Sequence, residues 1–240
     1  MKKCITLILL SLILISTFGQ NTKECAKSPF NASIELTTKY MWRGLEYGTS
    51  PAVLPSLNFS SGGFNAFVMG AYTWDGSHQE VDLGFNYNLK ALTFGVLDYY
   101  YPSNVGENDN YFNLKNRNTG HSVETYLTIA SEKSPAYVTI STFIFGNDKK
   151  FNGCQAYSSY AEIGYTHTFN DNKNISLAIG AALNKSFYTD YEKGFNIVNI
   201  AIKYVTALKF GNFQFPISTS YIINPYREKS YFTFSTYFGF

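Results

Sequence analysis

The chain has 240 residues, with 19 lysines and arginines against 17 acidic residues, and only 15% of its residues are charged. This balance argues against a nucleic-acid-binding protein, which would carry a basic patch. Tyr (20 residues) and Phe (21 residues) are very abundant, and the chain is long enough for one large β domain after a targeting segment.

The N-terminal segment, residues 1–20, is predicted to be a secretory signal peptide. It starts with Met1-Lys2-Lys3, continues as an apolar run from Ile5 to Ile15 and ends in small and polar residues. The apolar run is too short to span a bilayer as a helix, and we expect cleavage near Gly19 or Gln20. Cleavage removes Lys2 and Lys3, which leaves 19 − 2 = 17 basic residues against 17 acidic ones.

Residues 21–30 are polar and are expected to form a periplasmic leader. Two cysteines, Cys25 and Cys154, remain after cleavage, and an exported protein can pair them. The predicted topology places them at opposite ends of the fold, so we expect no disulfide between them. Neither has a histidine at metal-site spacing, and we expect no metal and no other cofactor.

A period-2 pattern begins at Asn31 and predicts one strand that ends at Arg43, before a loop that starts at Gly44. One face is mostly apolar and carries Ile34, Leu36, Thr38, Tyr40 and Trp42. The other face carries Glu35, Thr37, Lys39, Met41 and Arg43. Because successive side chains of a strand point to opposite faces, the charged face must contact water and the other an apolar phase. A soluble sandwich strand with an outer charged face fits this segment equally well.

The same pattern recurs along the chain and predicts about twelve strands of roughly ten residues, which suits tilted membrane crossings. The further predicted strands are residues 49–60, 64–74, 78–89, 91–101, 120–131, 135–146, 155–169, 174–184, 195–208, 212–223 and 229–240. No apolar run beyond residue 20 is long enough for a membrane helix, and open strand edges cannot be satisfied in lipid. The sequence therefore predicts an all-β fold: a closed antiparallel up-and-down transmembrane β-barrel over residues 31–240.

The last predicted strand shows the pattern most clearly. One face carries Phe232, Phe234, Thr236, Phe238 and Phe240, and the other carries Tyr231, Thr233, Ser235, Tyr237 and Gly239. This ending resembles the C-terminal signature of bacterial outer-membrane barrels, whose aromatic face contacts lipid. It implies location in the cell outer membrane of a Gram-negative bacterium, beside lipopolysaccharide, and recognition by the barrel-assembly machinery through the strand ending at Phe240. An ordinary sandwich strand is the alternative.

Loop lengths are predicted to alternate between the two ends. Short periplasmic turns fall near residues 61–63, 90, 132–134, 170–173 and 209–211, and most loops at the other end are longer. Aromatic residues cluster at the strand ends and predict two interfacial girdles. The outer girdle is predicted from Tyr40, Trp42, Tyr72 and Trp74, and the periplasmic girdle from Phe59, Phe64, Tyr87, Phe213 and Phe240.

Three residues do not fit this scheme. Pro55 and Pro216 lie inside predicted strands, where each removes a ladder hydrogen bond. Asp98 falls on the lipid-facing side, where a charge is costly away from an interface. A β-bulge beside each residue would reconcile it with the pattern.

The opening segment carries a recognisable motif. Residues 31–44 end in Tyr40-Met41-Trp42-Arg43-Gly44, and Pro51-Ala52 and Ser61-Gly62-Gly63-Phe64 follow. This stretch, which extends to about Trp74, resembles the start of the TorF (Gcw-chp) type family of outer-membrane proteins, which are catalogued as porins. Members begin with a strand that ends in an aromatic-x-aromatic-Arg-Gly motif. The resemblance implies a barrel and an outer-membrane location more firmly than a transported solute.

An outer-membrane enzyme would need a catalytic arrangement such as His and Ser two residues apart on one strand face. The three histidines are His78, His121 and His167, and none has Ser or Thr two residues later. His121 and Ser122 are adjacent and would face opposite sides of a strand. We therefore expect no enzymatic activity.

Eight charged residues are predicted to point into the barrel: Glu35, Lys39, Arg43, Glu80, Asp82, Glu124, Glu162 and Lys203. Such charges can line a water-filled path and select ions, or they can pair and fill the interior, as in small barrels. We predict a porin-like barrel with a narrow channel for small solutes or ions. Five acidic residues against three basic ones favour cations if the path is open. A plugged structural or surface barrel, and a secreted β-sandwich or lipocalin-like binding protein, are the alternatives.

Arg43 is predicted to lie at the outer rim and to point into the lumen. Trp42 is expected to face outward, so the next side chain must face inward. Gly44 can adopt the positive φ that opens the following loop. The expected partners of the guanidinium are Glu80 and Asp82, because forked hydrogen bonds to a carboxylate stabilise a buried arginine.

Overall fold

The structure, a computed structural model, describes residues 28–102, 110–116, 118–130, 134–170, 172–211 and 213–239. The predicted signal peptide (1–20), most of the predicted leader (21–30), Cys25 and Phe240 lie outside these residues. Cys154 is exposed and free. Because Cys25 is not among the described residues, the prediction that the two cysteines form no disulfide stays a prediction.

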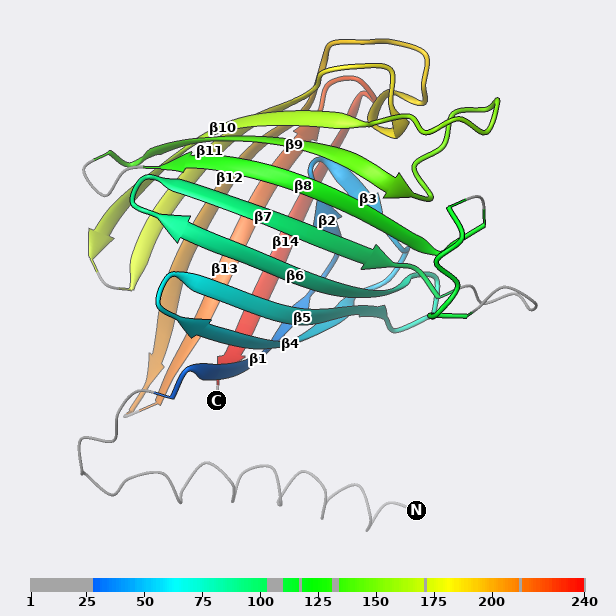
Figure 1. Cartoon of the computed structure of the whole chain (residues 1–240). Coiled ribbons are helices and arrows are strands. Elements are labelled where there is room, and N and C mark those ends of the chain that lie inside the picture. Colours follow the sequence, from blue (N-terminus) through cyan, green and yellow to red (C-terminus); the bar gives the residue numbers. More distant parts are fainter. Residues whose placement is uncertain are drawn as a thin grey trace.

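The described residues form a closed barrel of twelve antiparallel strands, which confirms the predicted fold class (Figure 1). Each strand pairs with its neighbours in the chain, and β1 closes the barrel against β14 and β4. The wall strands are β1 (Phe30–Thr37), β4 (Ala52–Ser61), β5 (Phe64–Thr73), β6 (Gln79–Leu89), β7 (Leu92–Tyr100), β8 (His121–Ala130), β9 (Ala136–Gly146), β10 (Ser159–Asn170), β11 (Lys173–Ala182), β12 (Asn196–Phe210), β13 (Phe213–Asn224) and β14 (Lys229–Gly239).

Alternation along the wall strands separates an apolar exterior from a polar interior. On β6, Phe85 and Tyr87 are exposed on the outer face, whereas Glu80 and Asp82 are each only 2% exposed and point inward. Four of the predicted girdle residues lie exposed on the outer surface near strand ends: Phe64, Tyr72, Trp74 and Tyr87. The side chains of Phe213 and Phe240, two further predicted girdle residues, are outside the described part of the structure.

The two prolines fit the wall in regular register. Pro55 pairs with Ile34 of β1, and the registered pairs between β4 and β5 stop at Val53 and resume at Ser56 without a shift. Pro216 pairs with Ala207 of β12 in regular register, and the β13–β14 ladder begins only at the next residue. Each proline therefore lies where its missing N–H interrupts or borders one ladder, and the wall accommodates it without a bulge.

The predicted first strand is interrupted, and this is the main departure from the sequence-based expectation. The wall strand β1 ends at Thr37, and β2 (Tyr40–Trp42) and β3 (Leu45–Tyr47) form a separate two-stranded hairpin. Figure 1 shows this hairpin, in blue, among the strands of the barrel. Its two-residue turn, Arg43-Gly44, has φ values of 50° and 78°. Positive φ at both central residues is what the type I′ turn of a tight β-hairpin requires.

The hairpin has one aromatic and one polar face. Tyr40 pairs with Tyr47 and Trp42 with Leu45, so these four side chains share a face; Met41 pairs with Glu46 on the other. Tyr40 and Leu45 are buried, and they belong to two interior apolar clusters. The prediction that Tyr40 and Trp42 face lipid in the outer girdle was wrong, because the interior offers these rings an apolar surface as well.

One further element completes the interior. The 3-10 helix η1 (Phe187–Thr189) lies in the loop between β11 and β12, and its Tyr188 is fully buried. In the part of the chain that the structure describes, no helix has the length and apolar character needed to cross a membrane.

Candidate lumenal site

The tip of the hairpin is fixed to the barrel wall by Arg43. Its Nη1 and Nη2 atoms lie 2.5 and 2.9 Å from Oε1 and Oε2 of Glu124, a two-point ion pair. Nη1 also donates to the Tyr188 hydroxyl (2.6 Å), and the Tyr99 hydroxyl donates to Glu124 Oε2 (3.0 Å). Because the Glu124 side chain is fully buried, these bonds replace the water that a carboxylate would otherwise bind.

The structure places Arg43 inside the barrel with an acidic partner, as predicted, but the predicted partners were wrong. Glu124 on β8 binds the guanidinium, whereas Glu80 Oε2 lies 2.9 Å from His78 Nε2. The reason is that the hairpin leaves the wall after Thr37, so its tip reaches β8, which lies two strands farther around the barrel than β6.

Aromatic rings surround this ion pair. The Trp42 ring stacks on Phe187 and Tyr188, with centroid distances of 6.3 and 5.8 Å. It also meets Tyr99 and Phe143 edge-on. The Arg43 guanidinium lies 4.3 Å from the Trp42 centroid and 4.6 Å from that of Tyr160, within cation–π range. This aromatic side of the hairpin is packed against β7, β9, β10 and η1.

Gly44 fits the turn tightly against β12 and β13. Its carbonyl oxygen accepts a hydrogen bond from Asn224 Nδ2 at 3.1 Å. A Cβ atom at this position would lie 2.0 Å from the carbonyl oxygen of Val198, so only glycine allows this approach. The positive φ predicted for Gly44 is confirmed, although it closes a hairpin rather than opening a loop.

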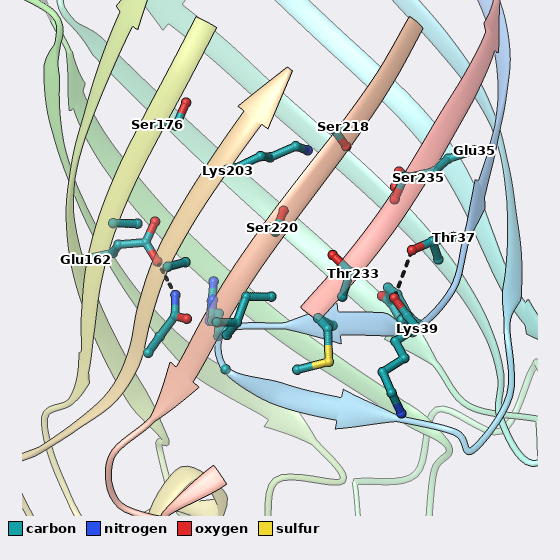
Figure 2. Close-up of a pocket in the computed structure, with 18 of the residues that line it drawn as sticks. Glu35, Thr37, Lys39, Glu162, Ser176, Lys203, Ser218, Ser220, Thr233 and Ser235 are labelled. Carbon is teal, nitrogen blue, oxygen red and sulfur yellow. Dashed lines mark hydrogen bonds between the residues drawn. The ribbon is translucent and has the colours of Figure 1, made fainter. Parts of the chain in front are cut away.

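The polar side of the hairpin borders a cavity of about 360 Å³ (Figure 2). Five of the eight predicted lumenal charges line it: Glu35, Lys39, Arg43, Glu162 and Lys203. Hydroxyl groups of the neighbouring wall strands line it as well: Thr37, Ser176, Ser218, Ser220, Thr233 and Ser235. Glu80, Asp82 and Glu124 also point inward but are buried outside this lining. Among the described lining residues, two carboxylates therefore face three cationic side chains, and the predicted acidic excess does not occur in the cavity.

Most of these charged groups have fixed partners. Glu162 accepts hydrogen bonds from Tyr137 (2.7 Å), Tyr160 (2.5 Å) and Asn199 (3.2 Å). The Lys203 ammonium donates to the Tyr237 hydroxyl at 3.1 Å. Glu35 lines the cavity and has no ion-pair partner among the described residues.

Sequence reasoning missed several residues of this site. Tyr188 lies in a loop and Asn224 at the end of a strand, and nothing in their sequence positions marks them as partners of the hairpin. The hydroxyl groups that β14 contributes to the cavity could have been predicted from the sequence, because Thr233 and Ser235 alternate with exposed aromatic residues. No group of three or more His, Cys, Asp or Glu in the described ranges could hold a metal ion.

Asp98 faces outward, as its parity predicted, and a second buried cluster explains how the wall accommodates it. His121 Nδ1 lies 2.7 Å from Asp98 Oδ2, and His121 Nε2 lies 2.6 Å from the carbonyl oxygen of Tyr111. The Tyr111 ring also packs against His121. The loop residues around Tyr111 thus cover the carboxylate at the rim. Both ladders of β7 are regular, and a register shift lies one strand away, between Val123 and Glu124 in the β8–β9 ladder, where Val123 is the cross-strand partner of Asp98.

His121→Phe is expected to release the segment 110–116 while the barrel stays folded. Phenylalanine keeps a ring but loses both polar contacts, which should lower the local opening free energy by about 1–3 kcal/mol. Limited proteolysis and hydrogen exchange of this segment measure the effect. The exposed His167, changed to Phe in the same way, is the control; equal protection of residues 110–116 in both variants would contradict the expectation.

Comparison with known proteins supports the fold. No family model and no curated protein matches the chain, so the resemblance of its opening segment to the TorF type family stays an expectation. A membrane-protein chain from a study of in-meso crystallisation matches with a TM-score of 0.50 and 10% identity, covering 88% of this chain and 83% of that one.

Two further solved structures are similar at lower scores. An outer membrane channel from Pseudomonas putida F1 has a TM-score of 0.46 and 11% identity, covering 92% of this chain and 98% of that chain. A bacterial polysaccharide outer membrane secretin has a TM-score of 0.37 and 10% identity, and the match covers 90% of this chain and 100% of that chain. At these identities the likeness concerns the fold alone.

Proposed function

We propose that the chain is a porin-like barrel of the bacterial outer membrane, with a narrow lumenal path for small solutes or ions that the β2–β3 hairpin closes in this conformation. The observation that carries the proposal is the charged and hydroxyl-lined cavity inside a wall whose outer face is apolar. A polar lumen within an apolar exterior is the arrangement of membrane channels built from strands. The proposal includes no catalytic role.

The location is tested by cell fractionation and by gel mobility. We expect the protein in the outer-membrane fraction, after removal of a signal peptide, with migration that changes on heating. Recovery as a soluble periplasmic protein would instead support a secreted binding protein, in which the cavity holds a ligand.

Transport is tested by conductance in planar bilayers, with intact protein and a variant that lacks residues 39–47. Thr37 and Ala52 are paired across β1 and β4, so this deletion leaves the five residues Thr38 and 48–51 to connect adjacent strand ends. We expect small or brief currents from the intact protein and conductance at least several-fold larger from the variant. A folded variant without conductance would support the second candidate, a plugged structural or surface barrel, which the buried aromatic side of the hairpin favours.

A further inference from the structure

Two cavities border the hairpin on the side of Lys39 and Glu46. The first, of about 360 Å³, includes Lys39 and Met41 in its lining. The second, of about 380 Å³, extends around the edge of β3 and is lined by Leu45, Glu46, Tyr47, Phe187, Asp190, Arg227, Lys229 and Tyr231. Lys39 and Glu46 form an ion pair with each other, so this pair stands between the two cavities.

The inner face of β14 connects the cavities. Ser235 and Thr233 line the first cavity, and Tyr231 and Lys229 line the second. These residues succeed one another at every second position, so neighbouring pairs are about 7 Å apart along one face of the strand. The cavities are therefore consecutive spaces on one wall of the barrel.

The opposite side of the hairpin leaves less space: the cavity found there among the described residues has a volume of about 160 Å³ and is lined by Tyr47, Phe143 and Phe187 together with residues of neighbouring loops. Tyr99, Phe143 and Tyr188 are buried there at 4% exposure or less and contact the Trp42 ring. The ion pair of Arg43 with Glu124 lies on this side as well. The wider space for a solute that crosses the barrel with this aromatic cluster intact is therefore on the polar side.

We infer that the solute path runs along the inner faces of β12, β13, β14 and β1, and that the Lys39–Glu46 ion pair is its gate. The inference rests on the proposed function. The side chains of the pair are 39% and 26% exposed, and such partly exposed pairs are weak and screened by salt. Lys39 and Glu46 can therefore separate while Arg43 and Gly44 keep the hairpin docked.

The lining also indicates the class of solute. The first cavity carries Glu35 and Glu162 against Lys39, Arg43 and Lys203. The second carries the acids Glu46 and Asp190 against Arg227 and Lys229. Charges of both signs, with hydroxyl groups between them, suit small hydrophilic solutes and give little preference for cations over anions. The reversal potential in a salt gradient should accordingly lie near zero.

The course of the path is tested with introduced cysteines in a background of Cys25→Ser and Cys154→Ser. Ser220→Cys is half-buried and lines the first cavity, whereas Ser141→Cys points inward from β9 at a position that is only 2% exposed. We expect a bulky, membrane-impermeant thiol reagent to reduce single-channel conductance at least two-fold in the Ser220 variant and to leave the Ser141 variant unchanged. Block at Ser141 without block at Ser220 would overturn the inference.

The gate is tested by Glu46→Gln, with Glu192→Gln at an exposed position in the loop between β11 and β12 as the control for loss of one negative charge. We expect the open probability to rise several-fold in the Glu46 variant only, and less so at high salt, where the native pair is already screened. If Glu46→Gln stays closed while the variant lacking residues 39–47 conducts, the gate is wrong and the channel function stands. If the deletion variant does not conduct either, the proposed function itself fails.

Discussion

Arg43→Ala is expected to undock the β2–β3 hairpin and to raise the conductance of the barrel. The substitution leaves the fully buried Glu124 carboxylate without its cationic partner. Breaking a buried ion pair in this way costs about 3–5 kcal/mol, because the remaining charge is neither hydrated nor compensated. The docked state should therefore lose most of its advantage, although the wall strands keep their ladders.

The measurements are conductance in planar bilayers and protease sensitivity of residues 38–48, both compared with the intact protein. The double variant Arg43→Met with Glu124→Gln is the matched control. It removes both charges, keeps an apolar side chain beside Trp42 and should restore much of the docking. Arg43 lines the first cavity, but its larger effect is to hold the hairpin. Unchanged conductance together with lower thermal stability of the whole barrel would show that Arg43 only braces the wall.

Gly44→Ala is expected to give the same undocked state without altering any charge. A methyl group at this position would lie 2.0 Å from the Val198 carbonyl oxygen, and the residue has a φ of 78°. Backbone atoms cannot move aside as a flexible side chain does, so the turn must withdraw from β12. The hairpin would then lose its contact with Asn224 and the geometry that presents Arg43 to Glu124.

Gly153→Ala separates the clash from the backbone strain. Gly153 has a similar φ of 80°, but a Cβ atom there meets nothing within 4 Å. It should show only the cost of a left-handed alanine, about 1–2 kcal/mol, confined to its exposed loop. Conductance and protease sensitivity of residues 38–48 should change in the Gly44 variant alone. An equal response of both variants would mean that strain, rather than contact with β12, governs docking.

The sequence was sufficient to predict the barrel because strand alternation is a local property. Each inward or outward position follows from its neighbours two residues away, as for Glu80 and Asp82 on β6 and for the aromatic residues of β14. About twelve such segments without a membrane helix leave closure as the way to satisfy every strand edge. Strand alternation also predicts that Glu35, Glu162 and Lys203 point into the lumen, where they line the cavity.

The tertiary structure alone decided what fills the barrel. The alternation of Tyr40 and Trp42 fits a lipid-facing strand and an aromatic interior equally well, since both surroundings are apolar. The choice depends on Tyr99, Phe143 and Tyr188, which three separate segments bring together. The partner of Arg43 is 81 residues away in the chain, and no local pattern encodes that distance. Parity thus determined which side chains face the lumen, whereas contacts between distant segments determined that the β2–β3 hairpin closes it.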